Sequence, residues 1–226
     1  MISSILIANR GEIAVRIVRA CREMGIRSVV AYSEADRHSL GVHLADDSVC
    51  IGPASSKESY LNIPNIISAA VLKGCDAVHP GVGFLSENAG FAREVVDAGL
   101  IFIGPKAETI SLLGDKVAAK KTAVKHGVPV IPGLEGSVDN VEAAQEKVDE
   151  IGYPVIIKAA AGGGGKGMRI VRRREDFAGV LKIASAEAEK AFSDGTVYVE
   201  KYLENPRHVE VQILGDSHGN VIHLGE

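Results

Sequence analysis

Strand-like and helix-like segments alternate along the first half of the chain, and this alternation constrains the fold more than any other feature. Strands are predicted at 5–8, 28–32, 75–80 and 100–104, and helices at 13–24, 63–73 and 86–98, with Gly25 ending the first helix and Ser86 capping the last. Parallel strands joined by helices form a sheet that is covered on both faces. The pattern therefore predicts a doubly wound, Rossmann-like α/β fold, with ligands beyond the carboxyl ends of the strands.

The pattern changes after about Gly114. Helices are predicted at 115–127, 140–152 and roughly 174–193, and strands at 153–159, 168–173, 197–203, 208–214 and 220–226. The later strands alternate apolar and polar residues, as in HVEVQIL, which favours an antiparallel sheet with one solvated or ligand-facing side. We therefore expect an α/β domain over residues 1–113 and an α+β domain over residues 114–226.

A run of four glycines, Gly162 to Gly165, separates two strand-like segments in VIIKAAAGGGGKGMRIV. Residues 162–167 fit the pattern GxGxxG, but a dinucleotide fingerprint needs a helix after the glycines, and Ile170 and Val171 favour a strand. The phosphate-binding P-loop pattern fails as well, because Gly167 stands where it needs Ser or Thr. What remains is a strand, a glycine loop and a second strand.

Two interpretations of this loop stay open. It is either a mobile surface hairpin, or a flap whose backbone N–H groups cover phosphates. Lys158 ends the preceding strand and Lys166 lies inside the loop. Two ammonium groups beside a row of free amides favour a polyphosphate ligand.

The composition excludes several classes of protein. A net charge of -4 implies no general attraction to nucleic acid or to an anionic membrane surface. The three cysteines, Cys21, Cys50 and Cys75, are widely spaced and are interpreted as reduced thiols. No apolar run approaches 18 residues and the N-terminus lacks the features of a signal peptide, so we expect a soluble cytoplasmic protein.

Several sequence blocks resemble one known family, in the same order along the whole chain. They are ILIANRGEIAVRIVRACREMGI, ADDSVCIGP, SYLNIPNIISAA, HPGVGFLSEN, FIGPKAETI, GDKVAAK, GYPVIIKAAAGGGGKGMRIV and EKYLENPRHVEVQILGD. With these blocks the chain resembles biotin carboxylase, the component of biotin-dependent carboxylases that belongs to the ATP-grasp superfamily. The resemblance implies that the second domain is an incomplete ATP-grasp domain.

The resemblance also implies a nucleotide site. The residues that it assigns to ATP are Lys116 and Lys158 at the phosphates, the lid residues Gly162, Gly163, Gly164, Gly165, Lys166 and Gly167, the adenine-binding residues Glu200, Lys201, Tyr202 and Leu203, and His208. His79 and the glycines of HPGVGFLSEN resemble the face where bicarbonate, biotin and nucleotide meet. The family commonly has an aromatic residue where this chain has Val82, so the biotin contact at that position is not carried over.

The reaction implied by the resemblance is ATP-dependent carboxylation of biotin on a carrier protein or domain, with bicarbonate, Mg²⁺ and a carboxyphosphate intermediate. Its other implied partners are a carboxyltransferase subunit or domain and, in the complete protein, a second copy of the chain. The catalytic and metal-binding residues are expected beyond Glu226, so we expect an N-terminal fragment that is inactive alone. The acyl-CoA, keto acid or urea substrate of the whole carboxylase stays open.

Three other functions compete with this one. Another ATP-grasp ligase, such as a carbamoyl phosphate synthetase or a purine-pathway ligase, shares the architecture. A non-catalytic nucleotide-binding module would share the site without the chemistry. A nicotinamide dehydrogenase is suggested only by the first α/β unit, where NRGEIA stands in place of a glycine fingerprint after ILIA.

Overall fold

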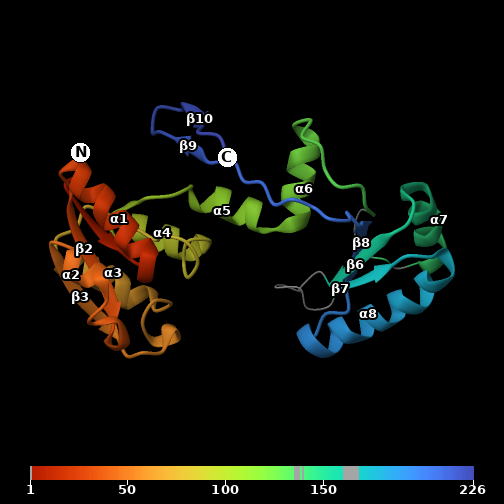
Figure 1. Ribbon diagram of the computed structural model, residues 1–226, viewed down its shortest axis with the longest axis horizontal. Helices are drawn as coiled ribbons and strands as arrows, with labels where there is room; N and C mark the ends of the chain where they lie inside the picture. The colour runs from red at the N-terminus through yellow and green to blue at the C-terminus, as the bar shows by residue number, and fades with distance from the viewer. Residues whose placement is uncertain (1, 135–137, 139, 160–167) are drawn as a thin grey trace. The chain divides into compact units, whose positions relative to one another are not determined.

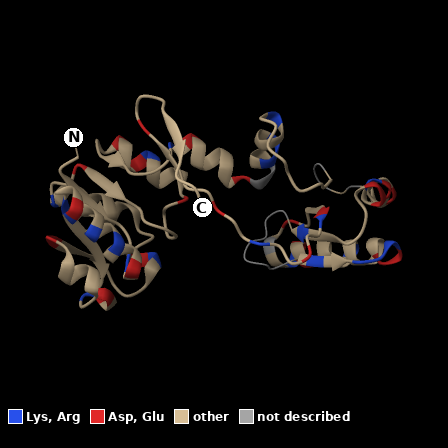
Figure 2. Cartoon of the chain, turned by 45° about the horizontal axis from the view of Figure 1, so that its top comes forward, with Lys and Arg blue, Asp and Glu red and all other residues tan. Residues whose placement is uncertain are grey.

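The computed structural model describes residues 2–134, 138, 140–159 and 168–226. The chain divides into two compact units, Met1–Gly127 and Val128–Glu226 (Figure 1). Figure 2 shows that acidic and basic residues are interspersed along each unit rather than gathered by sign. This mixing agrees with the small net charge of the chain, -4.

The first unit contains a five-stranded parallel sheet. Its strands are β1 (Ser4–Ile7), β2 (Arg27–Ser33), β3 (Asp47–Gly52), β4 (Ala77–His79) and β5 (Ile101–Phe102), and its helices are α1 (Gly11–Met24), α2 (Leu40–Leu44), α3 (Ile63–Leu72), α4 (Ala89–Asp97), α5 (Ala107–Gly114) and α6 (Lys116–Lys125). The strand order is β3-β2-β1-β4-β5, and every pair is parallel. The chain direction across the sheet therefore reverses between β1 and β4, which is where such folds bind ligands.

Both faces of this sheet are covered by helices, as predicted for a doubly wound fold. Alternate residues of β1 point to opposite faces, so Leu6 packs with α3 and α4, whereas Ile7 packs with α1 and α2. Both side chains are completely buried. The apolar run Ile5–Ile7 of β1 is thus explained by burial on both faces of the sheet.

Two helix boundaries show how the local sequence sets the elements. Gly25 ends α1 in the left-handed region at φ 67°, as predicted, and its N–H donates to Arg22 O. The predicted cap Ser86 is wrong, because α4 begins three residues later than expected. Asn88 caps it instead, with Oδ1 accepting a hydrogen bond of 2.8 Å from the N–H of Phe91.

The second unit contains a three-stranded antiparallel sheet in the order β7-β6-β8. Its elements are α7 (Val141–Ile151), β6 (Val155–Ala159), β7 (Met168–Val171), α8 (Phe177–Phe192) and β8 (Val197–Lys201), followed by the separate hairpin of β9 (Ile213–Gly215) and β10 (Val221–His223). Buried residues of α7 and α8, among them Val148 and Phe177, pack on alternate residues of the sheet such as Ile157 and Val199. One face of the sheet is therefore core, and the other is left for solvent or a ligand.

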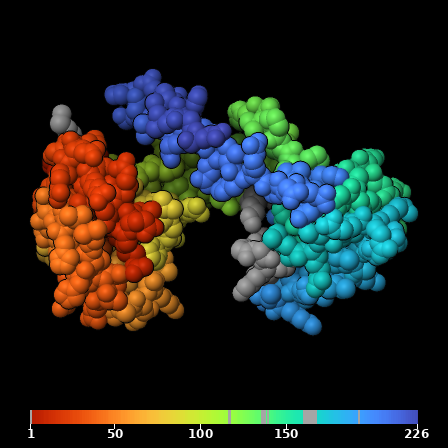
Figure 3. Space-filling model, viewed as in Figure 1, coloured from red at the N-terminus to blue at the C-terminus, as the bar shows by residue number. Residues whose placement is uncertain are grey.

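The strand predicted at 208–214 is wrong for most of its length. Only Ile213 and Leu214 of that segment belong to a strand, and β9 pairs antiparallel with β10. The alternating pattern of HVEVQIL is real, but alternation specifies a strand only when a neighbour supplies hydrogen bonds and covers the apolar face. Val209 and Val211 are exposed, and the deepest blue atoms of Figure 3 belong to the C-terminal end of the chain.

Candidate functional site

The face of the three-stranded sheet that points away from α7 and α8 carries a mixed set of side chains. The register pairs Ile156 with Ile170 and Glu200, and it pairs Lys158 with Met168 and Tyr198. Residues paired across neighbouring strands share a face, and these lie between the core residues along each strand. We call this surface the open face; it consists of Ile156, Lys158, Met168, Ile170, Tyr198 and Glu200.

A charge pair lies at the centre of the open face. The ammonium of Lys158 donates to Glu200 Oε2 at 2.8 Å, and these side chains are 27% and 14% exposed. The same ammonium lies 5.9 Å from the ring centroid of Tyr198, within reach of a cation–π attraction. Burial raises the pKa of the Tyr198 phenol, and the nearby Lys158 charge opposes that rise. The lysine is thus held on the face in a fixed position while part of it remains accessible.

The apolar side chains of the open face surround this pair. Met168 and Ile170 on β7 are exposed, and Ile156 on β6 is half-buried. A flat aromatic ligand that covered them would remove apolar surface from water, which contributes roughly 25 cal/mol per Å². Sequence analysis missed these three residues. Their alternation is visible in the sequence, but which residues of β7 and β8 join Lys158 depends on the register.

The backbone at the end of β8 leaves one donor available. The N–H of Lys201 donates to Pro132 O at 2.8 Å, and the N–H of Tyr202 donates to Pro154 O at 3.0 Å. Within the described part of the chain, the N–H of Leu203 has no hydrogen-bond partner. A free N–H two residues after the end of an edge strand suits an acceptor atom on the edge of a heterocyclic base.

In the first unit, a polar network joins the segments that follow the carboxyl ends of β1 and β2. Arg10 donates to both carboxylate oxygens of Asp36, at 2.9 Å and 2.7 Å, and the hydroxyl of Tyr60 donates to the same carboxylate at 2.8 Å. These hydrogen bonds, with that of Arg10 the largest influence, lower the pKa of Asp36 to about 2. An acidic group after the second strand would have to meet the ribose in a dinucleotide-binding fold. Here that carboxylate is already engaged, which disfavours the dehydrogenase alternative.

The loop after β4 is held by hydrogen bonds to Asn9, which follows the carboxyl end of β1. The buried Asn9 donates from Nδ2 to Pro80 O at 2.8 Å and to Val82 O at 2.9 Å. Gly81 lies at φ 68°, where a Cβ atom would come within 2.6 Å of the Asn9 side chain. His79 accepts the N–H of Gly81 on Nδ1 at 3.0 Å, and burial lowers the pKa of this imidazole. This loop is therefore held in place without a ligand.

Comparison with known proteins accounts for both units. The family model of the biotin carboxylase N-terminal domain matches residues 1–110. The family model of the carbamoyl-phosphate synthase L chain ATP-binding domain matches residues 115–226. Biotin carboxylase 1 of Bacillus subtilis is 56% identical over 226 residues, which are 100% of this chain and 50% of that protein. The chain belongs to the biotin carboxylase family. The family's enzyme from Haemophilus influenzae is 55% identical over 227 residues, covering 100% of this chain and 51% of the relative. The chain thus spans about half the length of these relatives.

Solved structures of the family agree with the fold. A biotin carboxylase–beta-gamma-ATP complex from Campylobacter jejuni matches with a TM-score of 0.86 and 54% identity, over 99% of this chain and 50% of the other. The biotin carboxylase domain dimer of Hydrogenobacter thermophilus 2-oxoglutarate carboxylase, in complex with MgADP, ADP and bicarbonate, matches with a TM-score of 0.84 and 47% identity, over 100% and 49%. Homologues of this family are ATP-dependent ligases.

The structure brings some of the predicted site residues together. Lys158 and Glu200 are in contact on the open face, and Lys201, Tyr202 and Leu203 follow directly. His208 lies in the segment before β9, where its side chain is 83% exposed and its Nε2 lies 3.2 Å from Glu210 Oε1. Among the described residues it makes no polar contact with the open face.

Other predicted residues are placed only in part. Lys116 begins α6, which Asp115 caps, and its side chain is outside the described part of the structure. Gly162, Gly163, Gly164, Gly165, Lys166 and Gly167 lie outside the described residues. In the described ranges no group of three His, Cys, Asp or Glu side chains is arranged to hold a metal ion. A search of the same ranges finds no helix with the length and apolar character needed to cross a membrane.

Proposed function

We propose that this chain supplies the nucleotide-binding part of an ATP-dependent biotin carboxylase, and that the open face is where ATP binds. The observation that supports this most directly is the ammonium of Lys158, which lies 2.8 Å from Glu200 on a side chain that is 27% exposed, on a face that also carries exposed apolar side chains. Three residues after Glu200 along the chain, the N–H of Leu203 has no partner among the described residues. A nucleotide needs the same three features, namely an apolar platform for the base, a polar group at its edge and a cation for the phosphates.

In this proposal each group has a separate role. The adenine ring covers Ile156 and Met168, while Glu200 and the N–H of Leu203 meet its polar edge. Lys158 and Lys116 bind phosphate oxygens, the glycines and Lys166 of the 162–167 loop cover them, and His208 reaches the nucleotide. Lys201 and Tyr202 belong to the adenine-binding segment through their backbone.

The proposed reaction begins with attack of a bicarbonate oxygen on the γ-phosphorus of ATP, which breaks the bond to the bridging oxygen and releases ADP. The product, carboxyphosphate, decomposes to phosphate and CO₂. A ureido nitrogen of biotin then forms a bond to the carbon of CO₂, and its N–H proton passes to the released phosphate. The relatives whose structures contain a nucleotide and bicarbonate support this choice of substrates. Mg²⁺ would be held by triphosphate oxygens together with carboxylates, and it would offset the negative charge of the phosphates.

The partners follow from the same proposal. Biotin arrives on a carboxyl carrier protein or domain, and a carboxyltransferase subunit or domain takes the carboxyl group onward. We also propose that the protein works in the cytoplasm as a homodimer, and that its first domain ends near residue 114. The family's pyruvate and 2-oxoglutarate carboxylases support an assembly of this kind.

The experiment that tests the function is a chimera, because the curated relatives are longer than the matched half. Residues 1–226 replace the matching half of Bacillus subtilis biotin carboxylase 1, with which they are 56% identical. We expect ATP hydrolysis that requires both bicarbonate and biotin, and its loss in Lys158→Ala. Lys147→Ala, at an exposed lysine of α7 without a polar partner in the described ranges, is the matched control. Full activity in Lys158→Ala would overturn the proposal.

A second ATP-grasp ligase activity is kept as the alternative, since the model that matches residues 115–226 is named for carbamoyl-phosphate synthase. The chimera distinguishes the two. ATP hydrolysis that needs bicarbonate but does not respond to biotin would favour the alternative.

A further inference from the structure

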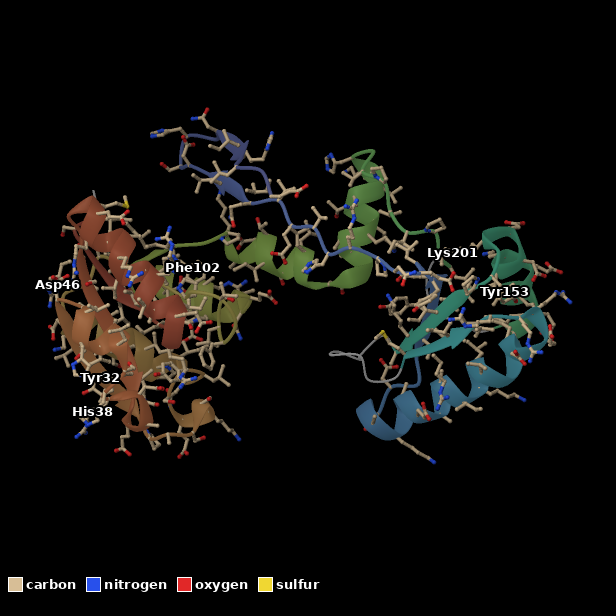
Figure 4. The ribbon with its side chains drawn as sticks, in the orientation of Figure 1. Tyr32, His38, Asp46, Phe102, Tyr153 and Lys201 are labelled. Carbon is tan, nitrogen blue, oxygen red and sulfur yellow. The ribbon has the colours of Figure 1, made fainter. Side chains whose placement is uncertain are left out.

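Lys201 lies at the end of β8 with its side chain on the opposite side of the sheet from Glu200. Its ammonium donates to Gly152 O and to Tyr153 O, both at 3.0 Å. Figure 4 shows Lys201 and Tyr153 close together at this end of the sheet. The lysine charge is therefore directed at backbone carbonyls rather than at the open face.

The two carbonyls belong to the turn that joins α7 to β6. Gly152 ends α7, and the last carbonyls of a helix lack partners within it. An ammonium at this position satisfies those acceptors and interacts favourably with the negative end of the helix. Lys201 thus connects the end of α7, the entry to β6 and the end of β8.

The backbone next to Lys201 is fastened to the same turn. The N–H of Tyr202 donates to Pro154 O at 3.0 Å, one residue beyond the carbonyl of Tyr153. On the other side of β8, the N–H of Lys201 donates to Pro132 O at 2.8 Å, and Gly133 forms a bridge with Glu200. The direction of the chain at Leu203 is set by these contacts, and the lysine side chain supplies two of them.

We propose that Lys201 is a positioning residue for the base of the nucleotide. It acts through the backbone, by holding the end of β8 so that the N–H of Leu203 and the carboxylate of Glu200 meet the base together. This inference rests on the proposed function, because it assigns the base to that site. It goes further because it assigns Lys201 to binding of the base alone, whereas Lys158 lies on the opposite face of the sheet, where its ammonium donates to Glu200.

The test compares ligands that contain different parts of ATP. AMP, ATP and inorganic tripolyphosphate are titrated calorimetrically into the 226-residue chain and into Lys201→Met, which keeps the aliphatic length but removes the donors. We expect AMP and ATP to bind about tenfold more weakly, or about 1.4 kcal/mol, and tripolyphosphate to bind with unchanged affinity. Lys201→Arg, which can donate to both carbonyls, should restore binding of AMP.

Two controls separate positioning from general damage. Lys147→Met removes the same charge from an exposed site in the same unit and should leave all three affinities unchanged. Thermal unfolding shows whether each variant is folded at the temperature of the titration. A purely structural role would weaken tripolyphosphate in parallel with AMP, and that result would overturn the inference.

Failure of this inference can be told apart from failure of the proposed function. If the wild-type chain binds AMP and Lys201→Met binds it equally well, only the role of Lys201 is wrong. If the wild-type chain binds neither AMP nor tripolyphosphate, the nucleotide site and the inference fail together.

Discussion

Because Lys158 and Glu200 form an ion pair, we predict that Glu200→Gln strengthens the binding of tripolyphosphate and weakens the binding of AMP. Glu200→Gln keeps the shape of the side chain and removes the negative charge that lies 2.8 Å from the Lys158 ammonium. In the proposed site, phosphate oxygens must compete with this carboxylate for the same ammonium. Removing the charge should therefore favour a phosphate ligand, and it should not favour the base.

The size of the effect follows from the burial of the pair. Hydrogen bonds to charged groups contribute about 1.5–3 kcal/mol, whereas exposed ion pairs contribute about 0–1 kcal/mol. Side-chain exposures of 27% and 14% place this pair between those limits, so we take about 1 kcal/mol. A gain of about 1 kcal/mol corresponds to roughly fivefold tighter binding of tripolyphosphate. AMP has no triphosphate to gain from the freed lysine and loses a charged acceptor at its base.

Isothermal titration of tripolyphosphate and AMP into the wild-type chain and Glu200→Gln measures both affinities. Glu187→Gln is the matched control, because it removes the same charge from an exposed pair with Arg169 in the same unit. Unchanged or weaker binding of tripolyphosphate to Glu200→Gln, with the control unaffected, would refute the reasoning.

Three further predictions concern the scaffold and are checked by urea unfolding with hydrogen exchange read separately for each unit. Because the pKa of Asp36 is lowered from 3.8 to about 2, its ionised form stabilises the first unit above about pH 4, and that stability is lost as the pH falls toward about 2. Asp36→Asn should cost about 2 kcal/mol near neutral pH and less below about pH 4; a constant difference would contradict this. Gly81→Ala should destabilise the loop after β4 by about 1 kcal/mol or more, because Gly81 has a positive φ and a Cβ atom there would meet the Asn9 side chain. An unchanged hydrogen-exchange rate in this loop would be inconsistent with that contact. Phe177→Ala removes a fully buried ring, so it should destabilise the second unit by about 3–5 kcal/mol and leave the first unit unchanged.

The parallel sheet could be predicted because its signals are local. Apolar runs such as that of β1 and helical spacing as in α1 are set by burial of the residues themselves. The less regular elements could not be found in this way. β3 mixes polar and apolar residues, with only Ile51 buried, and α5 begins without a side-chain cap.

The candidate site was only partly visible in the sequence. Lys158 and Glu200 come from the resemblance, but their contact depends on the register between β6 and β8, which no local pattern specifies. The same holds for Met168, which joins the open face by pairing with Lys158. The ammonium of Lys201 contacts a turn that lies about fifty residues earlier in the sequence. Helical or strand periodicity does not indicate such a long-range contact.

The central claim is that ATP binds on the open face, with its base at the end of β8. Hydrogen exchange of the 226-residue chain with and without MgATP tests it directly, at a nucleotide concentration that calorimetry shows to be saturating. We predict slower exchange in peptides that cover 197–203, where the N–H of Leu203 gains a partner, and unchanged exchange in α8 on the other face. Unchanged exchange across 197–203 in the saturated chain would contradict the account.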